Sequence, residues 1–222
     1  KMYNLDGSEG KMCGNGIRCV GKFLYDHGMV DINEKDEITI ETLSGIKKLK
    51  AYTSGGKVNR LRVDMGKAIL EPKEIPVVLD GDKVVDRPVE IAGKNYNITC
   101  VSMGNPHCVV FMDDIDNLDI ETVGPEFEND KLFPERVNTE FVTVLDDHTI
   151  KMRVWERGSG ETWACGTGAC AVAVAACENG FCKKGEDIKI KLKGGDLIIN
   201  YTDETVYMTG NAEKVFEGEV EV

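Results

Sequence analysis

One short pattern occurs twice in this chain and constrains its fold more than any other feature. EGKMCGNGIRCVGKFLYDHG runs from Glu9 to Gly28, and ETWACGTGACAVAVAACENG runs from Glu161 to Gly180. In each, a glutamate stands four residues before a cysteine, Cys-Gly-x-Gly follows, and an apolar run ends at a glycine fifteen residues after the cysteine. An apolar run closed by glycine is typical of a helix, so the pattern predicts two helices of about three turns. Two matching segments predict two similar halves, with the cysteines facing each other across a cleft.

The remaining segments are typical of short strands. Turn residues separate β-branched or alternating runs at 37–42, 61–65, 96–103, 108–112, 139–145 and 150–156, and a hairpin is predicted at 188–201 around Gly194-Gly195. A weaker helix is predicted within 120–129. Many strands with one long helix in each half favour the α+β class, each half wrapping a sheet around its helix. The run after Cys165 is apolar on nearly every side, which predicts a helix that is buried all round.

The charge balance excludes several kinds of partner. The chain has 222 residues, with 27 basic and 39 acidic side chains that leave a net charge of -12. This balance argues against binding to a nucleic-acid backbone or to an anionic membrane surface. The longest apolar stretch, at 169–177, is far too short to cross a bilayer. A small zwitterionic ligand is compatible with both observations.

The cysteines indicate reduced thiols in a cytoplasmic protein. Eight are too few for a disulfide scaffold of this length, and the sequence contains no Cys-x-x-Cys pair that would suggest a zinc site. Cysteine is among the most buried residue types, so six of the eight are expected in the core: Cys19, Cys100, Cys108, Cys170, Cys177 and Cys182. The matched surroundings of Cys13 and Cys165 set these two apart as candidate reactive thiols.

A cysteine followed by glycines at a helix start is suited to a particular chemistry. The glycines let the backbone approach a ligand and leave N–H groups free to bind an anion such as a carboxylate. The positive end of the helix dipole is expected to lower the pKa of a nearby thiol. Two such sites facing each other provide a thiolate and a thiol on opposite sides of one carbon. A two-base racemase or epimerase needs this arrangement, because one sulfur removes the α-proton and the other delivers a proton to the opposite face.

Other polar residues stand at strand ends, where binding residues are often found. GNPHC places Asn105 and His107 at a strand start, RVNTEF offers Asn138, and WERGSGE carries Glu156 and Arg157 at a strand end. Each also has an ordinary structural interpretation. Asn-Pro is a typical turn, a single histidine is more often structural than catalytic, and a neighbouring Glu-Arg is often an exposed ion pair of little value.

Four motifs together resemble the diaminopimelate epimerases, which are two-cysteine epimerases that work without pyridoxal phosphate. They are NLDGSEGKMCGNGIRC, SMGNPHCVVF, RVNTEFV and WERGSGETWACGTGACA, and the match covers nearly the whole chain. The resemblance implies interconversion of LL- and meso-diaminopimelate in lysine and peptidoglycan precursor synthesis. It also implies a cytoplasmic homodimer that acts on a small molecule, with no cofactor, no metal and no nucleic-acid or membrane partner.

The resemblance assigns roles to single residues. Cys13 and Cys165 match the catalytic cysteines, and His107 and Glu156 match positions that tune the thiol pair. The remaining matches are substrate-binding positions, with the helix-start amides holding the α-carboxylate: Asn4, Gly14, Asn15, Asn105, Asn138, Glu156, Arg157, Gly166 and Thr167.

The resemblance also implies a fold of two pseudo-symmetric halves, each a mixed β-sheet rolled into a barrel around a central helix. A strand that ends near Gly66 and a proline-containing stretch after it predict a boundary there. The expected halves are 1–66 with 211–222, which contains the Cys13 helix, and 67–210, which contains the Cys165 helix. Family members carry a further segment before the position of Asn4, so the first half is expected to be incomplete at its N-terminus.

Two other functions fit parts of the pattern. A racemase of another amino acid, such as histidine or proline, would use the same scaffold, although WERGSGET and RVNTEF favour diaminopimelate. A non-catalytic binding or thiol-redox protein would use the cysteine pair as a disulfide switch. The sequence leaves open which cysteine acts on which stereoisomer.

Overall fold

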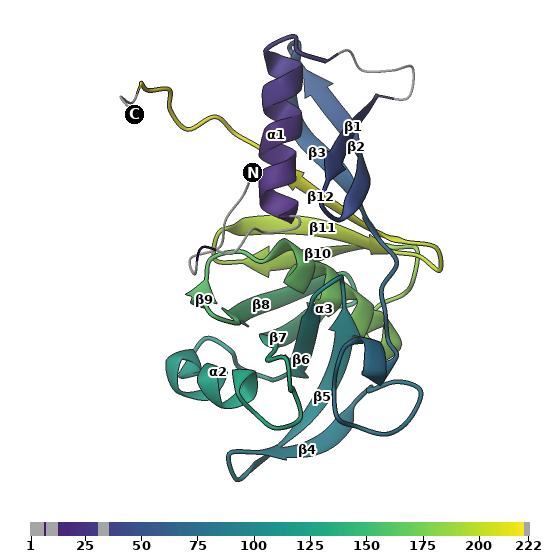
Figure 1. The fold of residues 1–222 in the computed structure, drawn as a ribbon, viewed down its shortest axis with the longest axis vertical. Helices are drawn as coiled ribbons and strands as arrows, with labels where there is room; N and C mark the ends of the chain where they lie inside the picture. Colours follow the sequence, from purple (N-terminus) through teal and green to yellow (C-terminus); the bar gives the residue numbers. More distant parts are fainter. Residues whose placement is uncertain (1–6, 8–12, 31–35, 220–222) are drawn as a thin grey trace.

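The structure is a computed structural model in which residues 7, 13–30 and 36–219 are described. The helices are α1 (Gly14–Asp26), α2 (Ile120–Glu128) and α3 (Gly166–Glu178), with a short 3-10 turn η1 (Pro72–Glu74) (Figure 1). The strands are β1 (Glu37–Thr42), β2 (Gly45–Ser54), β3 (Lys57–Gly66), β4 (Arg87–Ile91), β5 (Lys94–Ser102), β6 (Pro106–Phe111), β7 (Asn138–Asp146), β8 (Thr149–Glu156), β9 (Gly160–Thr162), β10 (Asp187–Leu192), β11 (Gly195–Tyr201) and β12 (Val206–Asn211). The predicted α+β class is confirmed.

The strands join into one mixed sheet. Their order is β1-β2-β3-β12-β11-β10-β8-β7-β6-β5-β4, and β9 pairs with β8. Most neighbours are antiparallel, but β6 and β7 are parallel, as are β8 and β10. Parallel neighbours need a crossover connection, which α2 provides between β6 and β7 and α3 provides between β8 and β10. β12 lies between β3 and β11, so it joins the first three strands to the later ones.

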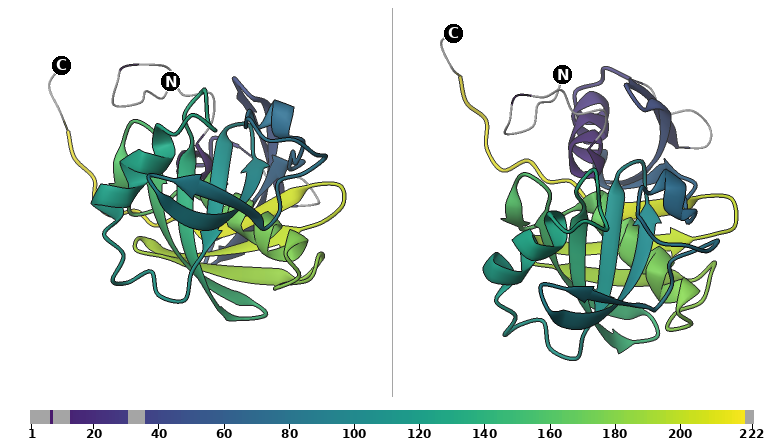
Figure 2. Two further views of the ribbon diagram at one scale, coloured as in Figure 1. Left: turned by 90° about the horizontal axis from the view of Figure 1, so that it is seen from below. Right: turned by 60° about the horizontal axis from the view of Figure 1, so that its bottom comes forward.

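α3 is buried on all sides, as its apolar sequence predicted. Every residue at 168–176 is buried, and the helix lies against β5, β6, β7, β10, β11 and β12. Figure 2 shows the sheet curving around this helix. The buried residues are glycine, alanine, valine and one cysteine, so the strands can approach the helix axis closely.

α1 is amphipathic and lies beside the first three strands. Its Ile17 and Gly21 are buried against β2 and β3, whereas Val20 and Phe23 on the other face are exposed. Gly28 ends this helix in a left-handed conformation with φ 64°, and Gly180 ends α3 with φ 80°. Both glycine stops that the sequence predicted are therefore present.

The register of β6 and β7 decides which polar side chains face α3. Val109 on β6 and Val142 on β7 belong to the apolar cluster around α3, and the opposite faces of these strands pack under α2. Successive side chains on a strand point to opposite faces. His107 therefore shares a face with Val109, and Asn138 and Glu140 share a face with Val142.

The strands expected from the sequence are present, and four others were missed. Each predicted run overlaps a strand of the structure, the hairpin at 188–201 is the antiparallel pair β10–β11, and the weaker helix is α2. The missed strands are β2, β4, β9 and β12. Lysines interrupt the apolar alternation of β2, β4 carries a proline at the sheet edge, β9 has only three residues, and β12 is short and contains a glycine.

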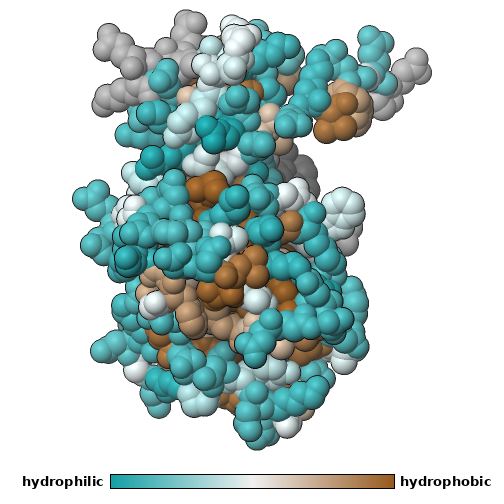
Figure 3. Space-filling view, turned by 180° about the vertical axis from the view of Figure 1, so that it is seen from behind, coloured by the Kyte–Doolittle hydropathy of each residue, from teal (hydrophilic) through white to brown (hydrophobic). Residues whose placement is uncertain are grey.

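The surface is mostly hydrophilic. Figure 3 shows apolar atoms exposed in the middle of one face and on the C-terminal segment, where Val215 and Phe216 are exposed. Within the described ranges, the structure contains no helix that is both long and apolar enough to cross a bilayer.

Candidate active site

Both cysteines of the repeated motif cap the helix that follows them. Cys13 is the N-cap of α1, and its Sγ accepts a hydrogen bond from the Gly16 N–H at 3.4 Å. Cys165 is the N-cap of α3, and its Sγ accepts from the Gly168 N–H at 3.4 Å. Cysteine is not a preferred N-cap residue, so its use at both helix starts needs a reason other than helix stability.

The two helix starts are in contact with each other. Asn15 Nδ2 donates to the carbonyl oxygen of Ala164 at 3.4 Å. A Cβ added to Gly166 would lie 3.5 Å from Gly14 Cα and 3.1 Å from Met208 Sδ, and a Cβ on Gly14 would lie 2.8 Å from Met208 Cε. Glycine at both positions therefore allows the helix starts to approach. The structure brings the two cysteine motifs together although they lie far apart in the sequence.

A buried arginine that the sequence did not single out holds Asn15 in place. Arg18 Nη2 donates to Asn15 Oδ1 at 3.2 Å, and Nη1 donates to the carbonyl oxygen of Gly14 at 3.1 Å. Burial lowers the pKa of Arg18, and charges on nearby thiols oppose this effect. Arginine is rarely buried without partners. The signal that the sequence offered for Arg18 is its position four residues after Gly14, which places both residues on one face of α1.

The two thiols have different surroundings. Cys165 is buried, whereas Cys13 is partly exposed. Burial raises the pKa of the Cys165 thiol well above its ordinary value, and the charge of Glu156 raises it further. Hydrogen bonds from Thr167 and Gly168 oppose this rise only in part. The expectation that a helix start lowers the thiol pKa is therefore wrong for Cys165, because burial outweighs the helix dipole.

A chain of hydrogen bonds leads from the core to Cys165. His107 Nδ1 lies 2.7 Å from Glu140 Oε1, and His107 Nε2 lies 3.1 Å from Asn105 Oδ1. Asn105 Nδ2 donates to Thr167 Oγ1 at 3.4 Å, and Thr167 Oγ1 lies 3.5 Å from Cys165 Sγ. Asn105, His107 and Thr167 were expected at the site. Glu140 was missed because it stands inside an apolar strand sequence, where only its charge set it apart.

Asn138 joins two segments beside the thiols. It is buried at the start of β7, its Nδ2 donates to the carbonyl oxygen of Pro106 at 2.9 Å, and its Oδ1 accepts from the Arg157 N–H at 3.0 Å. Asn138 therefore fixes the start of β6 and the loop after β8.

The loop after β8 carries Glu156 and Arg157, and both side chains have partners. Thr162 Oγ1 donates to Glu156 Oε1, and Arg157 Nη1 donates to the carbonyl oxygen of Glu135 at 2.9 Å. The predicted binding residue Asn4 lies outside the described residues.

A second carboxylate that the sequence did not single out supports this loop. Glu128 Oε1 accepts from the Gly158 N–H and from Arg136 Nη1, both at 2.9 Å, and its Oε2 accepts from Trp155 Nε1 at 2.7 Å. Glu128 is buried at the end of α2. Its three hydrogen bonds hold the loop that carries Arg157.

The expectation that the six other cysteines lie in the core is only partly right. All eight cysteines lie among the described residues and all are free thiols. Cys100, Cys108, Cys170 and Cys182 are buried, Cys177 is partly exposed, and Cys19 is exposed. The prediction that Cys19 lies in the core is therefore wrong. Cys19 follows the buried Arg18 on α1, and the helical turn directs it away from β3.

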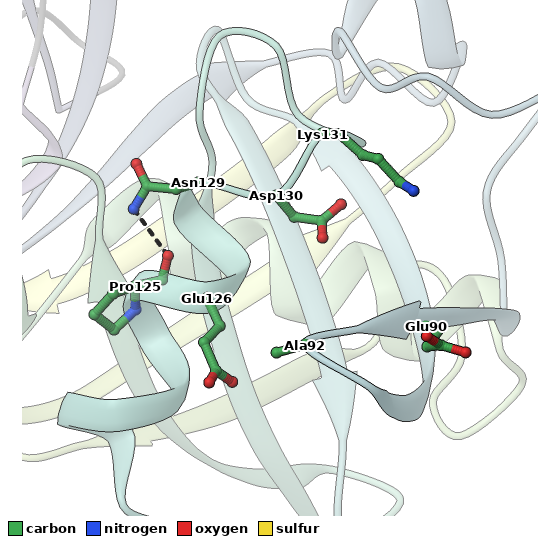
Figure 4. A pocket seen from close by; sticks show the side chains of 7 residues that line it. All are labelled: Glu90, Ala92, Pro125, Glu126, Asn129, Asp130 and Lys131. Carbon is green, nitrogen blue, oxygen red and sulfur yellow. Dashed lines mark hydrogen bonds between the residues drawn. The ribbon is translucent and has the colours of Figure 1, made fainter.

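One cavity adjoins the two helix starts, and another lies away from them beside α2. A cavity of about 450 Å³ lies between the end of α2 and the β4–β5 hairpin, and Figure 4 shows acidic side chains around it; its lining is Glu90, Ala92, Pro125, Glu126, Asn129, Asp130 and Lys131. A cavity of about 380 Å³ adjoins the helix starts, lined by Asn15, Arg18, Ala164, Leu192, Gly194, Gly195, Asp196, Leu197, Asn211 and Glu213. The second cavity borders the contact between Asn15 and Ala164, whereas neither cysteine motif contributes a residue to the first.

The comparison with known families identifies the chain. A model of the diaminopimelate epimerase family matches residues 1–71 and 99–215, which include both helix starts and the hydrogen-bond chain. The chain belongs to the diaminopimelate epimerase family. Relatives named diaminopimelate epimerase include those of Agathobacter rectalis, 52% identical over 231 residues, and Acetivibrio thermocellus, 53% identical over 224 residues. Both alignments cover 100% of this chain, and they cover 79% and 78% of the respective relatives.

Solved structures share the family's fold at low sequence identity. A probable proline racemase from Agrobacterium radiobacter aligns with a TM-score of 0.70 at 16% identity, covering 94% of this chain and 67% of that one. A phenazine biosynthesis protein from Bacillus anthracis aligns with a TM-score of 0.68 at 18% identity, covering 97% of this chain and 78% of that one. At these identities the similarity establishes the fold alone.

Proposed function

We propose that this chain is an epimerase that interconverts LL- and meso-diaminopimelate by passing the α-proton between Cys13 and Cys165. The observation that carries the proposal is the contact between two helix starts that are both capped by a cysteine. Membership of the family and relatives more than half identical support the substrate. In lysine and peptidoglycan precursor synthesis, this reaction changes the configuration of one α-carbon.

The helix starts supply the stabilisation that the reaction needs. Removing an α-proton pushes negative charge onto the adjoining carboxylate. The Gly16 and Gly168 N–H groups serve the sulfurs, and a helix has no internal acceptors for its other first-turn N–H groups. The amides of Gly14, Asn15, Gly166 and Thr167 are therefore assigned to the carboxylate, where the positive ends of both helix dipoles favour the charge.

The difference between the thiols suggests their starting roles. Burial favours the protonated form of Cys165 and the charge of Glu156 adds to this effect, so Cys165 starts as the acid. Cys13 starts as the base and takes the α-proton, and Cys165 then donates its proton to the opposite face of the carbon. The pair holds one proton before and after the reaction and two while the α-carbon is deprotonated, and the reverse direction begins from the opposite protonation of the pair.

The remaining assignments follow the same proposal. Asn4, Asn105, Asn138, Glu156 and Arg157 bind the substrate, and His107 and Glu156 adjust the thiols. No cofactor or metal takes part, since the two thiols move the proton and the helix starts hold the charge. The proposal also includes that the protein is a cytoplasmic homodimer without nucleic-acid or membrane partners. The net charge of -12 supports the exclusion of polyanionic partners.

We also infer that the chain divides into the two halves 1–66 with 211–222 and 67–210. The packing of α1 against β2 and β3, and of α3 against the later strands, supports this division. The division assigns one cysteine helix to each half, and the substrate would then bind where the halves meet.

The experiment is solvent deuterium exchange. Reduced protein is incubated in D₂O with LL- or meso-diaminopimelate, and incorporation at the α-carbon is followed by mass spectrometry together with the change of configuration. We expect both for diaminopimelate and neither for proline or histidine. Faster exchange with proline or histidine would show that this amino acid, and not diaminopimelate, is the substrate. Binding without exchange would indicate a non-catalytic protein.

A further inference from the structure

Glu140 is an acidic residue buried in the core beside the thiol site. Both it and His107 have fully buried side chains, and Glu140 Oε1 lies 2.7 Å from His107 Nδ1. Glu140 also lies directly against the first turn of α3, since a Cβ on Gly168 would come within 2.6 Å of Glu140 Oε1. Neither the name of the relatives nor the proposed catalytic pair assigns a role to Glu140.

The second oxygen of this carboxyl group shows which protonation state the site suits. Glu140 Oε2 is buried and has no hydrogen-bond partner among the described residues. A charged carboxylate oxygen without a partner in the core is costly, whereas the carbonyl oxygen of a neutral acid is much less so. Burial also raises the pKa of Glu140 and outweighs the opposing effects of a charge on His107, the hydrogen bond to His107 and a backbone hydrogen bond, while the charge of Glu156 adds to the rise.

The amide of Asn105 fixes the direction of the hydrogen bonds. Its Nδ2 donates to Thr167, so its Oδ1 must accept from His107 Nε2. His107 therefore carries a proton on Nε2, and a neutral ring then leaves Nδ1 as an acceptor. A protonated Glu140 supplies the donor that Nδ1 needs. At the other end, Thr167 already accepts from Asn105, so its own O–H is free to donate to Cys165 Sγ.

We propose that Glu140 is a positioning residue that stays a neutral carboxylic acid and, by donating to His107 Nδ1, directs the hydrogen bonds that end at the Cys165 thiolate. The assignment rests on the proposed role of Cys165 in proton transfer. When Cys165 has given up its proton, the Thr167 O–H and the Gly168 N–H donate to its sulfur. Without the donor, His107 Nδ1 is left buried without a partner, so His107 and Asn105 lose their fixed orientation and Thr167 no longer points at the sulfur.

Other groups that titrate also face Glu140. His107 lies on the same face of β6, Glu156 ends β8 and Cys165 caps α3, whereas Cys108 lies on the opposite face of β6. A negative charge on Glu140 would oppose the thiolate of Cys165, because like charges destabilise each other in a buried site. The neutral acid avoids this repulsion and still supplies the hydrogen bond.

The first test is the tautomer of His107, measured by ¹⁵N NMR on histidine-labelled protein. The chain has three histidines, and His27 and His148 are exposed, so Gln variants at these two positions assign the spectrum. We expect the remaining histidine to carry its only ring proton on Nε2 at neutral pH. A charged His107 at neutral pH, or a proton on Nδ1 alone, would overturn the proposal.

The second test compares two substitutions of Glu140 by side chains of similar size. Glu140→Gln keeps an N–H donor for His107 Nδ1, so we expect the same tautomer and a deuterium-exchange rate within about twofold of the wild type. Glu140→Leu removes the donor, and we expect the ¹⁵N signal of Nδ1 to shift as it loses its hydrogen bond and the exchange rate to fall about 10- to 100-fold, the effect of losing a hydrogen bond to a charged group. An exchange rate for Glu140→Gln as low as that of Glu140→Leu would mean that the negative charge is needed, and the proposal would fail. Full activity of a folded Glu140→Leu protein would contradict it equally.

A matched control and a separate outcome keep the interpretation clear. Glu128→Gln changes another buried carboxylate that supports the Arg157 loop, so it should alter KM and leave the His107 tautomer unchanged. If Glu140→Leu fails to fold, the wild-type tautomer and the Gln variant still decide the question. If the wild type shows no exchange at all, the proposed function fails while the tautomer measurement continues to test the role of Glu140.

Discussion

Replacing Gly168 by alanine tests the packing between the core carboxyl group and the helix that carries Cys165. A Cβ at this position would lie 2.6 Å from Glu140 Oε1 and 3.2 Å from both Glu140 Cδ and Met152 Cε. The nearest of these distances is shorter than real Cβ contacts, so either the Glu140 carboxyl group or the first turn of α3 must move. Either movement changes the surroundings of Cys165, because the Gly168 N–H donates to its sulfur.

The effect on stability is small compared with the effect on activity. Overpacking a buried site costs about 1–3 kcal/mol, and alanine in a helix recovers about 1 kcal/mol relative to glycine. The net loss in the free energy of unfolding is about 0–2 kcal/mol, which lowers the Tm of a chain of this size by at most about 4–8 °C. Losing one hydrogen bond to a charged sulfur costs about 1.5–3 kcal/mol, so kcat should fall about 10- to 100-fold.

The assay measures kcat by deuterium exchange and Tm by thermal unfolding in the same buffer. Gly21→Ala in α1 is the matched control, since its Cβ would lie 2.7 Å from Leu61 Cδ2 and 2.9 Å from Leu49 Cδ2, with no polar group nearby. We expect a similar fall in Tm for both variants and a fall in kcat only for Gly168→Ala. Equal kcat values in the two variants would refute the argument that contact between Glu140 and α3 positions the thiol.

Four further outcomes are expected. Cys13→Ala and Cys165→Ala should each abolish epimerisation with the fold intact, and the Ser variants should be severely impaired because a hydroxyl is a far poorer base; normal turnover by either Ala variant would remove the two-base mechanism. Activity should survive hydroxylamine and EDTA, since no Schiff base or metal is proposed, and a PLP absorbance band or loss with EDTA would contradict this. Mild oxidation should stop activity reversibly by joining Cys13 to Cys165, with diaminopimelate protecting; peptide mapping that finds these two thiols free in inactive protein would rule out the facing geometry. Glu140 has a raised pKa in the folded state because it is buried, so the folded protein binds the extra proton and loses stability as pH rises above about 4, the ordinary pKa of a glutamate; Glu140→Gln should lose less stability as pH rises, measured by denaturant titrations.

Much of the secondary structure could be predicted because it depends on neighbours in the sequence. The glycine stops at Gly28 and Gly180 and the alternating runs of β5 to β8 are local signals, and the structure has them. β4 and β12 could not be predicted in this way. Both are short, and their pairing with strands elsewhere supplies the stability that their own residues lack.

The sequence by itself determined the chemistry of the thiols. The repeated Cys-Gly-x-Gly places a sulfur at each of two helix starts, and this depends only on residues within one turn of each cysteine. Family membership follows from the same motifs.

Only the tertiary structure decided how the two thiols differ and which groups act on them. Burial within the curved sheet raises the pKa of Cys165, and it arises from strands far from Cys165 in the sequence. Glu140 reaches His107 because β6 and β7 pair in parallel with one register, which puts both side chains on the face towards α3. Burial and charge interactions depend on distance in space, and the sheet pairing that sets those distances is a long-range property of the chain.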